Sequence, residues 1–397
     1  MNAPVIKLQN KKTAYWNRAL VTLTCLSILA AFFWGIMRES ENVNPHLRTA
    51  FPEAEQFENQ SPGNFIALQD GHKIGYVTLS EAHGYGGPLR IAVGVDLKGV
   101  IVNLSMIKQR ETPSWYQRIL DDGFINIFKG KKVTDLFQIG DDVDAVSGAT
   151  STSRGITQAV QSASWDIGRD QLKLSVPKQQ KPDIQFGLPE IVLGLLILLW
   201  LVSKFWLSRH KKHIRWLSLL VSMVTLGFIY DSPLTLSFVN KMLLGYWPDW
   251  QNHLYWYMLI AFIVTTFIWN TKSVYCRWIC PFGTAQECIN ILGGAKSRNP
   301  LRFKSIFTWT QRSLTWAAIL LALIYRNPGM TSYEIFGSLF ELQGSTFQFI
   351  LLAMVMIASV FIKRPWCRYL CPLPPIYDFF KHLQNKAKGK WNKIITN

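Results

Sequence analysis

The sequence predicts a six-helix α-helical membrane protein with an extracytoplasmic α+β domain inserted after its first span. Three observations point to this architecture. Hydrophobic residues make up 49% of the 397 positions, with 24 Phe and 16 Trp, which is too apolar for an ordinary soluble protein. The charge is uneven, because residues 39–185 carry 15 Lys or Arg against 18 Asp or Glu in a chain of net charge +17. All six cysteines lie outside that stretch, which argues against a disulfide scaffold.

Six apolar runs are long enough to cross a bilayer. They lie at 19–37, 188–207, 214–231, 254–271, 306–325 and 345–362. We interpret the first run as an uncleaved anchor rather than a signal peptide, because the residues from Arg38 to Glu41 offer no small-residue cleavage site. Between the first two runs, Thr78–Leu79, Leu89–Leu97 and Val100–Ile107 have the character of strands and Thr152–Trp165 that of a helix.

Basic residues gather in alternate loops beside the apolar runs, which favours membrane topology over nucleic-acid binding as their explanation. Examples are Arg209, Lys272, Lys296, Arg298, Arg302 and Lys363. The positive-inside rule places both termini in the cytoplasm of a bacterium and the chain in its inner membrane. The expected domains are 1–38 (cytoplasmic start and first span), 39–185 (extracytoplasmic), 186–363 (five spans) and 364–397 (basic cytoplasmic tail). A polar hinge at Val176–Pro182 leads back to the membrane.

The inserted domain contains a short run of small residues, Ser147-Gly148-Ala149-Thr150, which follows Asp144 and precedes Thr152. Gly148 would let a phosphate-bearing cofactor approach the backbone closely. A threonine hydroxyl could be esterified by such a phosphate. The alternative is an ordinary turn that feeds the helix, with Ser or Thr as its N-cap.

The second half of the chain repeats Cys-x-x-x-Cys-Pro, at Cys276 and Cys280 and again at Cys367 and Cys371. Cysteines four apart share one helix face, and two pairs supply the four thiolates that Zn or an iron–sulfur cluster takes. Free interfacial thiols are the alternative. The segments Phe228–Pro233 and Leu323–Pro328 are also similar, so we expect spans three and four with one cysteine loop to be duplicated as spans five and six with the other.

The run from Asp144 to Thr152 resembles the modification site of the FMN-binding domain family, which includes subunits of the sodium-pumping quinone reductase and the Rnf complex. The resemblance implies that a flavin transferase links FMN to Thr150 by a phosphoester, with Thr152 as the less favoured acceptor. Two further segments resemble that family, and are expected to line the flavin ring. They are Gly84–Pro88, with Tyr85 and Gly86, and Glu111–Pro113, with Glu111 and Thr112.

The second half resembles the membrane part of NosR, NirI, NapH and PceC. The resemblance implies an electron-transfer flavoprotein that joins the quinol pool, membrane redox subunits or a cytoplasmic-side donor to an extracytoplasmic reductase or its maturation machinery. Covalent FMN and a cysteine-bound iron–sulfur centre would carry the electrons, separated by most of the bilayer. Whether the protein oxidises quinol itself stays open, and no catalytic residue is assigned.

Two other interpretations fit parts of the sequence. A redox-sensing regulatory or assembly protein would use the same cofactors without sustained turnover. A transporter is weaker, because it explains neither Thr150 nor the cysteines. None of the seven histidines lies in the middle of a span, so a membrane b-type haem is not expected. We interpret the Trp-rich segment Tyr246–Trp256 mainly as an interfacial aromatic belt against lipid.

Overall fold

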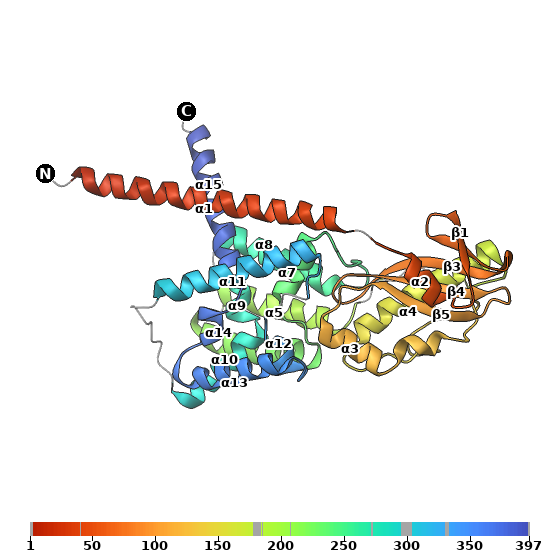
Figure 1. Ribbon diagram of the computed structural model, residues 1–397. Helices are drawn as coiled ribbons and strands as arrows, with labels where there is room; N and C mark the ends of the chain where they lie inside the picture. The colour runs from red at the N-terminus through yellow and green to blue at the C-terminus, as the bar shows by residue number, and fades with distance from the viewer. Residues whose placement is uncertain are drawn as a thin grey trace.

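The computed structural model describes residues 3–39, 41–177, 184, 186–206, 208–270, 273–294, 304–329 and 333–395. A sheet domain and a helical part lie side by side, with the long α1 (Ala3–Arg38) running along the helical part (Figure 1). The expected basic residues Lys272, Lys296, Arg298 and Arg302 lie outside the described residues. So does most of the expected hinge, from residue 178 onward.

The sheet domain is an antiparallel meander in which sequence neighbours pair, in the order β1-β2-β3-β4-β5. The strands are β1 (Gln56–Ser61), β2 (Asn64–Gln69), β3 (His72–His83), β4 (Pro88–Asp96) and β5 (Ile101–Lys108). The three expected β-rich runs lie in strands, Thr78–Leu79 within β3 and the other two in β4 and β5. Polar, largely exposed β1 was not predicted, nor was β2.

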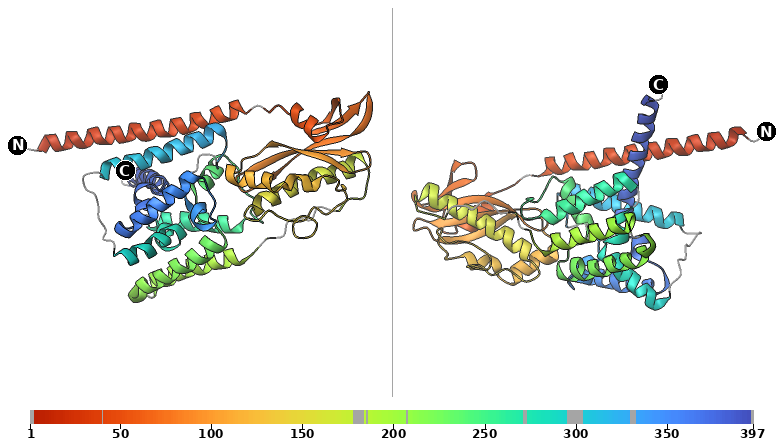
Figure 2. Two further views of the ribbon diagram at one scale, coloured as in Figure 1. Left: turned by 60° about the horizontal axis from the view of Figure 1, so that its bottom comes forward. Right: turned by 180° about the vertical axis from the view of Figure 1, so that it is seen from behind.

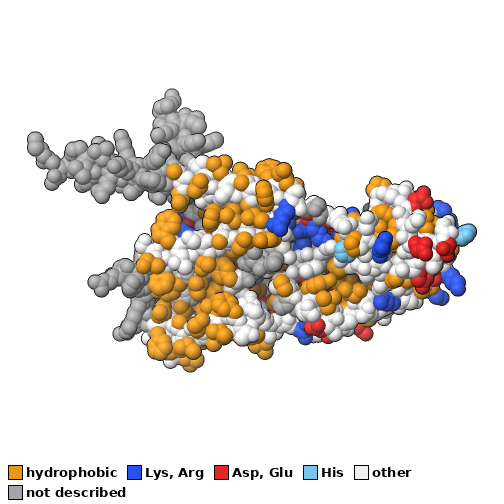
Figure 3. All heavy atoms as spheres, in the orientation of Figure 1, with side chains coloured by type: hydrophobic (Ala, Val, Ile, Leu, Met, Phe, Trp, Pro, Cys, Tyr) orange, Lys and Arg blue, Asp and Glu red, His pale blue; other side chains and the backbone are white. Residues whose placement is uncertain are grey.

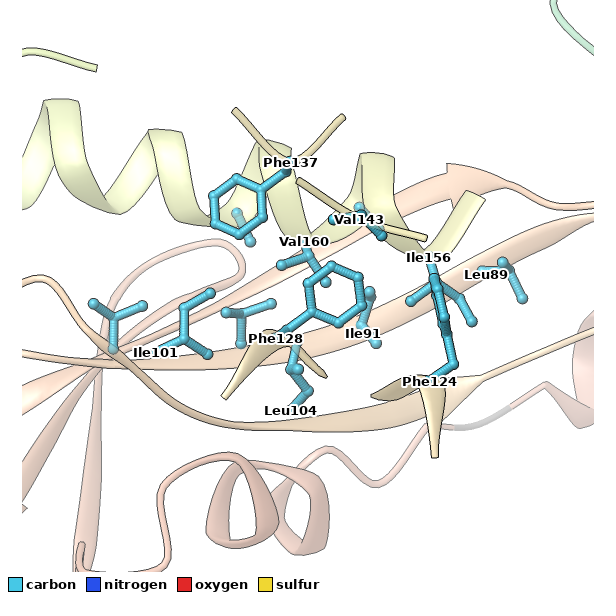
Figure 4. Close-up of a cluster of buried hydrophobic side chains, with 14 of the residues drawn as sticks. Leu89, Ile91, Ile101, Leu104, Phe124, Phe128, Phe137, Val143, Ile156 and Val160 are labelled. Carbon is cyan, nitrogen blue, oxygen red and sulfur yellow. The ribbon is translucent and has the colours of Figure 1, made fainter. Parts of the chain in front are cut away.

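Helices cover both faces of the sheet. The amphipathic helix α4 (Thr150–Asp166) packs on β3 and β4, and η1 (Phe124–Phe128) packs beside β5 (Figure 2). Ile156 and Val160 of α4 meet Ile91 of β4 and Phe128 in a buried core (Figure 4). The opposite face is covered by α2 (Asn44–Ala50). Short elements complete the domain: α3 (Pro113–Asp121) and η2 (Ile167–Gln171).

The remaining helices build the helical part, whose visible face is largely hydrophobic, whereas charged side chains gather on the sheet domain and at the junction (Figure 3). They are α5 (Leu188–Phe205), η3 (Ser208–His210), α6 (Lys211–Ser222), η4 (Met223–Ile229), α7 (Leu236–Leu243), α8 (Leu254–Asn270), α9 (Val274–Trp278), α10 (Pro281–Gly293), α11 (Lys304–Tyr325), α12 (Phe336–Phe340), α13 (Thr346–Phe361), α14 (Pro365–Tyr369) and α15 (Leu373–Ile395).

Among the described residues, three helices are long and apolar enough to cross a membrane: Ala19–Arg38, Leu188–Phe205 and Lys211–Ile229. A fourth span results if the bent pair Leu254–Trp269 and Val274–Gly293, which turns by 106°, is counted as one. Helices do occupy all six apolar runs, but α13 has only 16 residues. The chain therefore has the apolar helices of a membrane protein, while the six-span count stays a prediction.

The expected duplication is visible in the order of elements. The series α6–η4, α7, α8, α9, α10 is followed by α11, α12, α13, α14, α15. The two cysteine turns are built alike, because the Cys280 N–H donates to the Tyr275 carbonyl and the Cys371 N–H to the Trp366 carbonyl, both at 2.9 Å. Asp231 and Arg326, which follow the first helix of each copy, share a left-handed backbone with φ of +37° and +49°.

The sheet domain contacts the helical part through the loops that follow these helices. Lys241 Nζ on α7 donates to the Tyr85 carbonyl at 2.8 Å. The Arg110 guanidinium stacks over the Tyr246 ring at 4.6 Å and donates to the Arg326 carbonyl. These contacts fix the sheet domain against one end of the duplicated helices.

Candidate functional site

The predicted attachment residue begins α4. Thr150 is exposed, and Gly148 before it has φ of +75°, a conformation that favours glycine. The first N–H groups of a helix have no partner within it, and the helix dipole adds positive potential there. A phosphate joined to Thr150 would therefore sit where helix N-termini bind anions, so the residues present fit a phosphate ester.

Thr152 occupies a different environment only two residues later. It is fully buried, and its hydroxyl donates to Glu111 Oε2 at 2.9 Å. The Gly86 N–H donates to both oxygens of the same carboxylate at 3.2 Å. Glu111 thus connects the Gly84–Pro88 turn to α4 through these hydrogen bonds. Burial raises the pKa of Glu111, and the hydrogen bonds from Thr152 and Gly86 partly oppose this.

A cavity of about 420 Å³ opens beside Thr150, within the size range of small-molecule pockets. Both parts of the chain line it. The sheet domain contributes Tyr85, Gly86, Thr112, Trp115, Gly148, Ala149, Thr150, Ser151 and Thr152. The helical part contributes Ile229, Tyr230, Asp231, Ser232, Thr235, Ser237, Phe238, Lys241, Pro248, His253, Trp256, Pro328, Gly329 and Glu341.

The helical side of the cavity combines aromatic rings with ionisable groups. Phe238 and Trp256 stack with ring centroids 4.1 Å apart. Lys241 is only 6% exposed, and burial lowers its pKa to about 8, which the Glu111 carboxylate partly opposes. The carboxyls of Asp231 and Glu341 line the same side, and Asp231 Oδ1 and Glu341 Oε2 are buried without a hydrogen-bond partner among the described residues. Such a wall offers flat contacts for a ring and charge for its polar edge.

The structure brings the two cysteine turns together inside the helical part. Cys280 and Cys371 are buried, and Cys276 and Cys367 pack against the same core. Gln286 Nε2 lies 3.5 Å from Cys367 Sγ, and its Oε1 accepts from the Trp366 N–H at 3.0 Å. Two pairs of soft thiols that converge from both copies fit the donor set of an iron–sulfur cluster.

The thiols are spread more widely than the ligands of a single ion. Among the described residues, no three His, Cys, Asp or Glu side chains converge as a single metal ion requires. In a four-iron cluster each thiolate binds a different iron, so its ligands stand farther apart. The Cys276 and Cys280 thiols still lie within electrostatic range of the Cys367 thiol.

The thiol turns lie closer to the cavity than the expected separation by most of a bilayer. Ser232 lines the cavity, and its carbonyl accepts a 2.9 Å hydrogen bond from the Tyr255 hydroxyl. Tyr255 in turn belongs to the same buried core as Cys280. Tyr275, which precedes Cys276, accepts a 2.8 Å hydrogen bond from the Leu234 N–H. The cysteine segments bend back into the bundle, which a linear count of spans could not show.

Some of the predicted site residues line the cavity and others lie outside its lining. Tyr85, Gly86, Thr112, Ala149 and Thr150 line the cavity beside Gly148 and Thr152. Asp144 and Ser147 are exposed and are not part of the lining, and Glu111 stands behind it. Their roles toward the flavin stay predictions.

Sequence reasoning missed the helical contribution to the cavity. Trp115, Asp231, Lys241 and Glu341 carried no motif. Trp256 lay in the Trp-rich segment, which we interpreted as an aromatic belt. The only available signal was the similarity of the two loops that contain Asp231 and Arg326, because a repeated loop of unusual polarity suggests a shared site.

Comparison with known proteins gives matches to both parts of the chain. The FMN-binding domain family matches residues 84–164, and the 4Fe-4S binding domain family matches twice, at 253–300 and 346–393. The double match supports a repeat of the last span and cysteine loop of each copy, while the inclusion of spans three and five stays a prediction. The G subunit of a proton-translocating ferredoxin:NAD(+) oxidoreductase complex from Clostridium ljungdahlii is 30% identical over 36% of this chain and 85% of its own length. The chain belongs to the FMN-binding domain family that this G subunit represents.

Two further relatives are matched over smaller shares of their own length. A putative electron transport protein YccM from Escherichia coli is 30% identical over 29% of this chain and 35% of its own length. A regulatory protein NosR from Pseudomonas aeruginosa is 25% identical over 35% of this chain and 21% of its own length. The chain therefore spans only about a fifth to a third of the length of these two relatives. FMN and an iron–sulfur cluster are its cofactors, and its relatives indicate membrane electron transport.

Proposed function

We propose that this protein carries electrons between a cysteine-bound iron–sulfur cluster and FMN esterified to Thr150. The flavin domain lies outside the bacterial inner membrane and both termini lie in the cytoplasm. The protein links the quinol pool or a cytoplasmic-side donor to an extracytoplasmic reductase or its maturation machinery. FMN exchanges one or two electrons, so it suits a junction between one-electron and two-electron partners.

The observation that carries this proposal is the short connection between the cavity and the thiol turns. Tyr255 donates to the Ser232 carbonyl of the cavity wall and packs in the same buried core as Cys280. Tyr275 joins the Leu234 N–H to the segment that contains Cys276. Thr150 opens into the same cavity. Two redox groups held at these positions are separated by packed side chains rather than by lipid.

The role of each residue follows from its place. Thr150 anchors the flavin, with the N-terminus of α4 against its phosphate. Tyr85 and Trp256 offer aromatic faces to the ring from opposite parts of the chain. Cys276, Cys280, Cys367 and Cys371 hold the cluster. Gln286 holds the second cysteine turn in position by its contacts with Trp366 and Cys367.

The test uses the full chain, expressed with a flavin transferase. The native protein is expected to show a fluorescent band after denaturing electrophoresis and to contain iron and acid-labile sulfide. Cys280→Ser and Cys371→Ser are expected to lose the iron and sulfide but keep the fluorescent band. Cys288→Ser is the matched control, because Cys288 lies on α10 outside the two turns. Iron content unchanged in both turn variants would overturn the cluster assignment.

A regulatory or assembly role is the second candidate, favoured by the similarity to a regulatory NosR protein. The two roles differ in rate. A conduit must reduce its flavin as fast as its donor is oxidised, whereas a sensor needs only equilibrium. Rapid-mixing measurement of flavin reduction by a quinol, compared with respiratory turnover of the same membranes, separates them.

A further inference from the structure

Lys241 is a buried cation in the wall of the cavity into which Thr150 opens. It lines the cavity from α7 and is only 6% exposed. Its Nζ donates to the Tyr85 carbonyl at 2.8 Å and to the Gly84 carbonyl at 3.4 Å. An ammonium group has three N–H donors. Among the described residues, these two contacts leave one donor for a group inside the cavity.

The charge of Lys241 is only partly compensated by the protein. The Glu111 carboxylate opposes the effect of burial on Lys241, but its oxygens already accept from the Thr152 hydroxyl and the Gly86 N–H. Burying a charge is costly unless it is paired. Lys241 nevertheless stays protonated at neutral pH, because burial lowers its pKa only to about 8. The fold therefore keeps a positive charge at this wall.

The other ionisable side chains in the wall do not replace this charge. Asp231 and Glu341 are acidic. His253 is the second basic residue among the described lining residues. Burial lowers the pKa of His253, and the Lys241 ammonium lowers it further, so the imidazole is neutral at pH 7. Lys241 is thus the cation of the described lining.

The same face of α7 carries an aromatic surface beside the cation. Phe238 lies three residues before Lys241, so the two side chains are neighbours on the helix, and both line the cavity. The Phe238 ring stacks on Trp256 with centroids 4.1 Å apart. A flat aromatic surface next to an ammonium group fits a planar ring that gains negative charge.

We propose that the Lys241 ammonium compensates negative charge on the ring of the Thr150-linked FMN and thereby raises its reduction potential. Charge placed near a flavin ring is one way in which a protein tunes the cofactor. This inference rests on the proposed function, because it assumes that the ring occupies the cavity. It gives a residue of the helical part a chemical role in a site otherwise built by the sheet domain.

The charges balance without a proton from Lys241. Reduction by two electrons and one proton adds one negative charge to a flavin ring. The electrons come from the iron–sulfur cluster, whose own reductant is a quinol or a cytoplasmic-side donor, and the proton comes from water. Lys241 keeps its proton and offsets the added charge. Reoxidation passes the electrons to the acceptor and returns the proton to water.

The test measures an equilibrium rather than turnover. The full chain, expressed with a flavin transferase, is reduced stepwise at pH 7 beside a dye of known potential, and absorbance gives the equilibrium constant between dye and flavin. Lys241→Gln keeps an N–H donor but loses the charge, and should lower the constant for flavin reduction at least about tenfold. Lys241→Arg keeps the charge and should recover most of this loss.

Lys73→Gln is the matched control. Lys73 is exposed near the start of β3 and outside the cavity lining. Exposed charges that lie far apart are screened by salt, so this variant should change the constant by less than about threefold.

Equal constants in Lys241→Gln and the native protein overturn the inference. So does an equal loss in Lys241→Gln and Lys241→Arg, because the shape of the side chain rather than its charge would then be responsible. Failure of the proposed function is recognised before any titration, since native protein without a covalent flavin band overturns that function and this inference with it.

Discussion

The Thr152 hydroxyl donates to Glu111 Oε2 at 2.9 Å while remaining fully buried. This contact distinguishes the two threonines at the start of α4, because Thr150 is exposed and opens into the cavity. An enzyme that attaches a flavin must reach the hydroxyl it modifies. The structure therefore gives a physical reason for Thr150 as the acceptor.

The two threonines are expected to respond differently to substitution. Thr150→Val should abolish the fluorescent band without destabilising the sheet domain. Thr152→Val should keep the band but lower the stability by roughly 1–3 kcal/mol, because Glu111 loses a buried hydrogen-bond donor. In-gel fluorescence and hydrogen exchange of the β4 amides measure the two effects. A band lost only in Thr152→Val would show that the acceptor is misassigned.

The buried Glu111 carboxyl predicts a pH-dependent stability of the sheet domain. A pKa raised in the folded state means that the folded protein binds the proton more tightly than the unfolded chain. The stabilising contribution is therefore complete below the usual glutamate pKa and is lost as the pH rises through the raised value. Glu111→Gln, whose amide oxygen can still accept from the Gly86 N–H, should flatten this dependence.

Hydrogen exchange of the sheet amides as a function of pH checks this prediction in the full chain. Glu81→Gln serves as the control, since Glu81 is exposed on β3. The control should keep the native slope. Equal slopes in Glu111→Gln and the native protein would contradict the assignment of the effect to Glu111.

The junction between the sheet domain and the helical part leaves no room for a side chain at Gly329. A Cβ there would lie 2.7 Å from Thr112 Oγ1 and 3.1 Å from the Thr112 nitrogen. We expect Gly329→Ala to loosen the docked sheet domain and to speed hydrogen exchange at Trp115, whose N–H donates to the Thr112 carbonyl. Gly194→Ala is the control, because a Cβ at Gly194 meets nothing within 4 Å. Unchanged exchange in Gly329→Ala would contradict the tight contact.

Arg364 joins the two copies of the duplicated unit. Its Nη1 donates to the Cys276 carbonyl at 2.6 Å, and its Nε lies 3.0 Å from Glu287 Oε1. Loss of one partner from a buried ion pair costs about 3–5 kcal/mol. Since Arg215 still contacts Glu287 at 2.9 Å, we expect Arg364→Ala to fall at the low end of this range, with a lower thermal midpoint in detergent and a reduced iron content.

Two comparisons separate this effect from a general loss of charge. Arg364→Lys keeps the charge but cannot reach two partners as a planar guanidinium does, so an intermediate midpoint is expected. Arg312→Ala removes an exposed arginine that lies 3.7 Å from Asp378, and should change stability by less than about 1 kcal/mol. A larger loss in Arg312→Ala than in Arg364→Ala would contradict the bridging role.

The elements that the sequence predicted are those with a strong local signal. β4 alternates less than a one-sided strand because both of its faces are buried, and its Val and Ile content still marked it. β1 was missed because Gln56–Ser61 is polar and largely exposed at the sheet edge. Its place is set by pairing with β2, which is a tertiary effect.

The candidate site was predictable only on the side that carries a motif. Thr150 and the cysteines stand in short, repeated or recognisable runs. Asp231 lies in the loop after η4, Lys241 on α7 and Glu341 after α12, and tertiary packing of these elements with the sheet domain forms the cavity. The nearness of the thiols to that cavity depends on the 106° bend before α9. The amino-acid composition along the chain does not predict such a bend.

The sheet domain is joined to apolar helices at both ends, to α1 before it and to α5 after it. The sheet domain therefore binds the loops of the helical part within one molecule, at a high effective concentration. Each contact that holds it there, such as Lys241 to the Tyr85 carbonyl and Arg110 on the Tyr246 ring, therefore contributes more than it would between two separate proteins.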